Sequence, residues 1–164
     1  MNRRTTTKLP EAITAFIAIT WLGMLLGVSF IATPVKFQAP SLSLPVALEI
    51  GRVTFSLFSK IEWATAALLI LSGLACKRRI LSLLFCAGLA AILTAETSWL
   101  LPILDIRVEA IISGTPTPAD WHHFLYVGLE MIKATLLIAL SIHLLRQLTA
   151  AHESPDIPYG ETVP

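Results

Sequence analysis

Four long apolar stretches, separated by three short polar or proline-containing segments, make up most of this chain. They run over residues 11–32, 46–76, 79–113 and 118–148. A helix that spans the hydrocarbon core of a bilayer needs about 20 mainly apolar residues, each rising about 1.5 Å. Every stretch is long enough, so the pattern predicts four membrane-spanning helices. Residues 1–10 form a short tail, and residues 149–164, with prolines and mixed charge, are expected to be a disordered tail.

The composition agrees with a membrane protein. Of the 164 residues, 55% are hydrophobic and 14% are charged, which is unusual for a soluble domain. The first apolar stretch is also longer than the roughly 7–15 residues of a signal-peptide core, so we expect it to remain as a helix. The predicted fold class is therefore an all-α integral membrane four-helix bundle. The net charge of +1 gives no indication of a nucleic-acid partner, and none is expected.

The basic residues predict the orientation. They gather before the first helix (Arg3, Arg4, Lys8), between the second and third (Lys77, Arg78, Arg79) and at the end of the fourth (Arg146). The other two loops hold only Lys36 and Arg107. Because basic loops stay in the cytoplasm, both termini are expected there, in an N-in/C-in topology. The expected location is a bacterial inner membrane.

Helices two to four are predicted to extend beyond the outer membrane surface. The second, at about 31 residues, would reach about 46 Å, whereas the hydrocarbon core is about 30 Å thick. The outer parts of these helices carry a set of polar candidates for a site at the mouth of the bundle: Glu49, Arg52, Asp105, Arg107, His122, His123 and Tyr126.

A second set of ionisable residues lies deeper. Counted from the cytoplasmic basic residues, Glu62, Glu96 and Glu130 lie at heights of about 22, 25 and 24 Å. Lys60 and Lys133 fall at similar heights. Each such group costs about 2.5–3.5 kcal/mol in lipid, so all five are expected to turn inward and pair. Two roles stay open for this cluster. One is to fix the packing, with Glu130 bound to Lys133 and Glu62 or Glu96 bound to Lys60; the other is to carry a proton or a small solute.

Metal and haem sites receive less support from the spacing. A di-iron or di-manganese bundle site uses Glu-x-x-His pairs, and the sequence contains none. Three of the four histidines, including His122 and His123, belong to the fourth helix, which disfavours a haem held between two helices of this chain. Asp120, His122 and His123 are weak candidates for a metal site, because adjacent histidines point about 100° apart on a helix. An interfacial aromatic belt is the favoured interpretation of this segment.

The sequence contains no hydrolase elbow, zinc-protease, phosphate-loop or dinucleotide motif, so a non-enzymatic role is favoured. We expect an accessory subunit of a membrane complex or a transporter-like protein, surrounded by lipid and paired with a membrane protein or a second copy. Gly23 and Gly27 offer a Gly-x-x-x-Gly face for such pairing. No cofactor is predicted. The rival hypothesis is a redox protein with a metal ion, quinone or haem at the outer mouth.

A family resemblance lies mainly in residues 23–67, within the first half of the chain. The stretch "GMLLGVSFIATPVKFQAPSLSLPVALEIGRVTFSLFSKIEWATAAL" resembles the first half of the uncharacterised four-helix membrane family that includes eukaryotic transmembrane protein 205. Beside a glycine-rich first helix, the shared positions are Phe30, Pro34, Phe37, Ala47, Gly51, Arg52, Phe55 and, near the start of the fourth helix, His123. The resemblance implies a four-helix membrane architecture and a protective or trafficking role, but no defined reaction.

Overall fold

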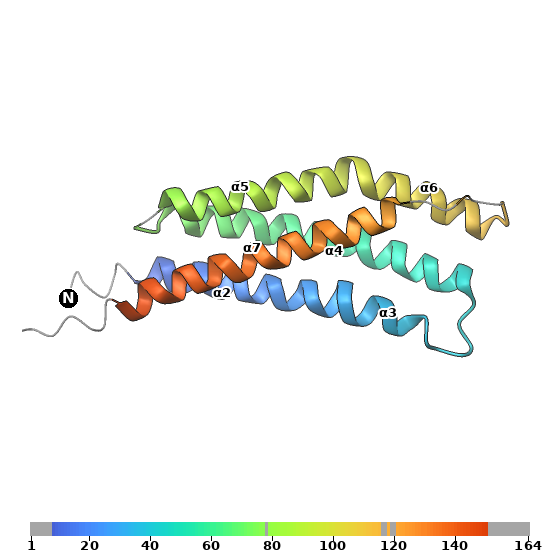
Figure 1. The fold of residues 1–164 in the computed structure, drawn as a ribbon, viewed down its shortest axis with the longest axis horizontal. Coiled ribbons are helices and arrows are strands. Elements are labelled where there is room, and N and C mark those ends of the chain that lie inside the picture. The colour runs from blue at the N-terminus through green and yellow to red at the C-terminus, as the bar shows by residue number, and fades with distance from the viewer. Residues whose placement is uncertain (1–7, 78, 116–117, 119–120, 151–164) are drawn as a thin grey trace, which may run out of the picture.

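Four long helices run side by side in the computed structural model, which describes residues 8–77, 79–115, 118 and 121–150 (Figure 1). The first long helix consists of α2 (Leu9–Leu25), η1 (Leu26–Ala32) and α3 (Thr33–Lys36). The second is α4 (Leu44–Leu74). The third consists of α5 (Arg79–Ala95), η2 (Glu96–Leu100) and α6 (Leu101–Ile112), and the fourth is α7 (His122–Ala150).

The described part of the chain contains four helices that are long and apolar enough to cross a membrane, and no strand. They cover Leu9–Lys36, Leu44–Leu74, Arg79–Ile112 and His122–Thr149. The predicted all-α fold with four candidate spans is therefore confirmed. The first helix continues four residues past the predicted end at residue 32.

Two of the long helices change to π-helical winding part-way, in η1 and η2. A proline follows each π segment, Pro34 in α3 and Pro102 in α6. Proline lacks a backbone N–H and its ring clashes with the carbonyl four residues earlier, so α-helical winding cannot continue unchanged. The Thr33 hydroxyl donates to the carbonyl of Val28 at 2.8 Å, which supports the wider turn of η1. Such π segments are rare and often lie at functional sites.

The interior of the bundle is apolar along most of its length. Its fully buried side chains include Trp21, Leu25, Leu69, Leu89, Leu93, Leu137, Leu140 and Leu144. Helix α2 packs mainly against α7 and also against α4, and α4 packs against α5. Many large apolar side chains point outward instead, including Phe16, Ile80 and Phe124. This is the arrangement that a bundle surrounded by lipid requires.

Gly23 and Gly27 do not serve close packing inside the bundle. A Cβ atom added at either position would meet no atom within 4 Å. Gly23 is exposed and Gly27 is half-buried. The Gly-x-x-x-Gly face is therefore open to the surroundings.

The described chain begins and ends at the same end of the bundle, beside the turn that joins α4 to α5 (Figure 1). We call the opposite end, where α3 and α6 finish, the far end. At the near end, the buried Glu11 carboxylate accepts the backbone N–H of Lys77 at 2.9 Å, and Thr14 Oγ1 lies 3.4 Å from Cys76 Sγ. Burial raises the pKa of the Cys76 thiol, which keeps the sulfur protonated. Cys76 and Cys86 are both free and buried.

Candidate functional site: a buried carboxylate–lysine cluster

Lys133 lies at the centre of three carboxylates inside the bundle. Its Nζ is 2.8 Å from Glu62 Oε1, 2.7 Å from Glu96 Oε2 and 2.9 Å from Glu130 Oε1. None of the four side chains is more than 2% exposed. A lysine ammonium has three protons to donate, so its capacity matches the number of carboxylates around it. We call Glu62, Glu96, Glu130 and Lys133 the carboxylate–lysine cluster.

All four long helices reach this cluster. Glu62 comes from α4, Glu96 opens η2, and Glu130 and Lys133 are three residues apart on one face of α7. The first long helix contributes two donors. Trp21 Nε1 in α2 donates to Glu62 Oε1 at 3.0 Å, and Ser29 Oγ in η1 donates to Glu130 Oε2 at 3.1 Å. The cluster therefore holds the helices together at one level.

The charges of the cluster do not balance. Three carboxylates surround one ammonium, so the formal charge of the four side chains is −2 when every carboxylate is ionised. Among the described residues, Glu96 Oε1 is buried and accepts no hydrogen bond, whereas the buried Glu130 Oε1 lies 2.9 Å from Lys133 Nζ as its ion-pair partner. A buried charge without a full set of partners is costly. This excess favours the uptake of a further positive charge at the cluster.

The same three carboxylates have the spacing of a cation site. One oxygen of each lies within 4.8 Å of the other two. The Lys133 ammonium already lies among these oxygens, so a metal ion would have to compete with it. A proton needs no such displacement.

A cavity of about 540 Å³ extends from the cluster toward the far end. Ser29, Tyr126 and Glu130 line its inner end. There the Tyr126 ring packs edge-on against the Phe55 ring, with 5.3 Å between the ring centroids. The walls are mainly apolar: Phe30, Val127, Leu101, Leu104, Val108, Ile111, Leu44, Leu48 and Phe37. Charged groups also line it: Lys36, Arg52, Asp105, Arg107 and Glu130, with His123 beside them. The cavity thus joins an apolar chamber to the buried charges.

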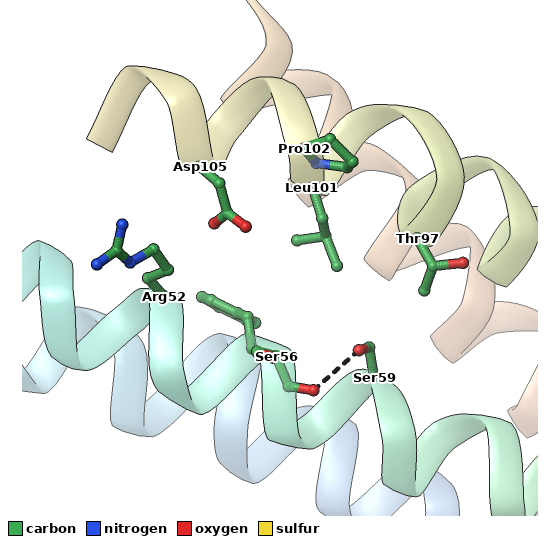
Figure 2. A pocket seen from close by; sticks show the side chains of 8 residues that line it. Arg52, Ser56, Ser59, Thr97, Leu101, Pro102 and Asp105 are labelled. Atoms are coloured by element: carbon green, nitrogen blue, oxygen red, sulfur yellow. Dashed lines mark hydrogen bonds between the residues drawn. The ribbon is translucent and has the colours of Figure 1, made fainter. Parts of the chain in front are cut away.

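A smaller crevice of about 170 Å³ lies between α4 and the helix formed by η2 and α6. Figure 2 shows Arg52 and Asp105 facing each other across it, with Ser56 and Ser59 along the α4 side. Arg52 and Asp105 line the larger cavity too, so the two spaces adjoin. Arg52 also forms a 2.7 Å ion pair with Glu109, which is mostly exposed.

Lys60, the fifth residue predicted for the buried cluster, does not join it. Its side chain is exposed on α4, and the partner of both Glu62 and Glu96 is Lys133 instead. The reason is the helix period. Lys60 and Glu62 are two residues apart, which places them about 200° from each other around α4. Equal depth therefore did not mean a shared face.

The residues predicted for the outer mouth fall into different places. Arg52, Asp105, Arg107, His123 and Tyr126 line the cavity, and Tyr126 is buried. Glu49 is exposed on α4 and is not part of the lining.

The two adjacent histidines separate as the helix period requires. His122 stacks on Trp121 with 4.5 Å between centroids and approaches Trp99 edge-on, while His123 lines the cavity. Asp120, the third weak metal candidate, lies outside the described residues.

Trp21 and Ser29 were not predicted as part of the site. The height argument would have found Trp21, because it lies about 20 Å above Lys8 and so matches the level of the glutamates. Ser29 gives no comparable signal, since a serine in an apolar helix commonly bonds to its own backbone.

Comparison with protein families, with curated proteins and with solved structures gives no match to this chain. The resemblance to the family of transmembrane protein 205 therefore stays a prediction.

Proposed function

We propose that this chain is a small transporter-like protein of a bacterial inner membrane. The carboxylate–lysine cluster is its proton-exchange site, and the far-end cavity is its solute site. Both termini lie in the cytoplasm, so the cavity faces the periplasmic side.

This proposal rests on the position of Glu130, which belongs both to the carboxylate–lysine cluster and to the lining of the cavity. Its Oε1 lies 2.9 Å from Lys133 Nζ inside the cluster, and the same side chain lines the cavity. Ser29 and Tyr126, which lie beside it at the inner end, line the cavity as well. A solute in the cavity and a proton on the cluster therefore influence the same carboxylate. Intramembrane ionisable groups that line a cavity are typical of proton and solute pathways.

The charge of the cluster supports proton exchange over a purely structural role. An ion pair that only holds helices together needs one carboxylate for each ammonium. This cluster has three carboxylates around one ammonium. The buried Glu96 Oε1, which accepts no hydrogen bond among the described residues, is the position where a proton would bind. One added proton brings the formal charge from −2 to −1, and a second brings it to zero.

Infrared difference spectroscopy of the protein in lipid tests proton exchange. As the pH moves from mildly acidic to mildly alkaline, the wild type should show the loss of a protonated carboxyl band. The band should weaken or shift in Glu96→Gln and Glu130→Gln, because each variant removes one carboxylate of the cluster. Glu49→Gln is the matched control, since Glu49 is exposed and outside the cavity lining.

Proteoliposomes with a trapped pH dye test transport. An imposed proton gradient should dissipate faster with the wild type than with Glu130→Gln, while Glu49→Gln should match the wild type. An identical spectrum and identical flux in all variants would overturn the proposal. Proton exchange without any flux would instead assign the protein to an accessory role in a larger complex.

The topology gives a separate prediction. A fluorescent protein fused after Pro164 should fluoresce, and an alkaline phosphatase fused there should be inactive, because basic residues at this end favour the cytoplasm. The same phosphatase inserted after Gly114, in the turn that follows α6, should be active. The reverse pattern of activities would place the cavity on the cytoplasmic side.

A further inference from the structure

The far-end cavity holds a lysine that forms no ion pair with any residue the structure describes. Lys36 lines the cavity and is half-buried. Among the residues that the structure describes, none forms an ion pair with it. Its ammonium lies 5.1 Å from the centre of the Phe37 ring and rests against Gly51, where any side chain would collide with Nζ. The absence of a side chain at position 51 thus makes room for this ammonium.

The rest of the cavity is suited to a hydrocarbon chain. Its volume of about 540 Å³ falls within the roughly 300–1,000 Å³ of ordinary small-molecule sites. Leu48, Leu104, Val108 and Ile111 form apolar wall between Lys36 and the inner end. A free inorganic anion bound at Lys36 would make no apolar contact with this wall.

The position of Lys36 along the helix agrees with a lipid-like ligand. Lys36 is the last residue of the first candidate span, so in a bilayer crossed by this helix its ammonium would lie near the level of the lipid head groups. A ligand with its head at Lys36 and its chain toward Tyr126 would lie as a lipid does, with the head at the surface and the chain in the apolar layer.

We propose that the cavity binds a single-chain anionic amphiphile, a long-chain fatty carboxylate, with its head group on Lys36. This inference rests on the proposed function, because it names the solute class of the same site. The other cations of the cavity are less available: Arg52 is paired with Glu109, and Asp105 lies opposite it. A lipophilic cation would meet three basic side chains, Lys36, Arg52 and Arg107, against the two carboxylates of Asp105 and Glu130. A neutral quinone would leave the Lys36 charge uncompensated.

Equilibrium binding of radiolabelled palmitate to the protein in phosphatidylcholine nanodiscs tests this inference, with empty nanodiscs as the background. Lys36→Gln should weaken binding at least about tenfold, the loss expected for one charge-assisted contact of about 1.4 kcal/mol. Lys60→Gln is the matched control, because it removes an exposed lysine outside the cavity and should bind like the wild type. Palmitate methyl ester, which lacks the charge, should bind wild type and Lys36→Gln equally.

A second variant tests the apolar part of the cavity. Leu104→Trp fills the chamber and should reduce binding of both the acid and the ester. Equal palmitate binding by wild type and Lys36→Gln would overturn the inference, as would a stoichiometric quinone in a solvent extract of the purified protein. If the wild type exchanges protons but does not bind palmitate, this inference is overturned and the proposed function stands. If the wild type binds palmitate but does not exchange protons, the proposed function is overturned and the ligand site stands.

Discussion

Lys133→Met is expected to destabilise the protein by about 3–5 kcal/mol, the cost of removing one partner from a buried ion pair. Methionine keeps a long flexible side chain but removes the one ammonium that, among the described residues, contacts Glu62, Glu96 and Glu130. The measurement is unfolding by sodium dodecyl sulfate, followed by circular dichroism. The loss of stability in Lys133→Met should exceed the loss in Glu130→Leu. In Glu130→Leu, Lys133 is still paired with Glu62 and Glu96.

Lys60→Met provides the control for this variant. Lys60 is an exposed lysine on α4, so its replacement should leave the unfolding curve within about 0.5 kcal/mol of the wild type. Adding Glu62→Gln, Glu96→Gln and Glu130→Gln to Lys133→Met should restore part of the stability, since the uncompensated charges are then gone. If Lys133→Met unfolds like Lys60→Met, the cluster does not hold the bundle together.

Trp21→Ala is the second large effect, with an expected destabilisation of about 3–5 kcal/mol. Trp21 is fully buried in α2, and its indole N–H donates to Glu62 Oε1 at 3.0 Å. The substitution therefore leaves a cavity and removes a donor from a buried carboxylate. Trp21→Phe keeps most of the ring and should cost about 1.5–3 kcal/mol, the usual contribution of a hydrogen bond to a charged group, while Glu62 Oε1 still accepts from Lys133 Nζ.

Trp63→Ala is the matched control, because Trp63 is a partly exposed tryptophan on the outer side of α4. Its effect on the unfolding curve should be small compared with that of Trp21→Ala. The difference between Trp21→Ala and Trp21→Phe measures the packing of the phenyl-sized part of the ring, and the difference between Trp21→Phe and wild type measures the hydrogen bond together with the smaller loss of ring volume. A Trp21→Phe variant as stable as wild type would mean that Glu62 needs no indole donor.

The sequence allowed the helices to be predicted because span length is a property of local composition. Heights counted along the helices also placed Glu62, Glu96 and Glu130 at one level, and the structure brings these three side chains together around Lys133. Lys60 was assigned wrongly because height ignores rotation about the helix axis. Two residues on one helix at similar depth can face opposite directions.

Other parts of the site depend on packing that the sequence does not reveal. The width of the far-end cavity follows from how η1, α4, α6 and α7 meet, and no local pattern records that arrangement. Pro34 and Pro102 signal an irregularity in their helices, yet they do not say that it takes the form of a π turn. Ser29 reaches Glu130 from η1, across a sequence separation of 101 residues.

The position of Lys133 in the chain has a consequence for the order in which the protein is assembled. Glu62 and Glu96 lie on helices that are synthesised before α7, the helix that carries their ion-pair partner Lys133. Until α7 arrives, the second and third long helices each present an acidic group without the Lys133 ammonium, whereas α7 brings Glu130 and Lys133 as an internal pair. The last helix is therefore the one that completes the fold.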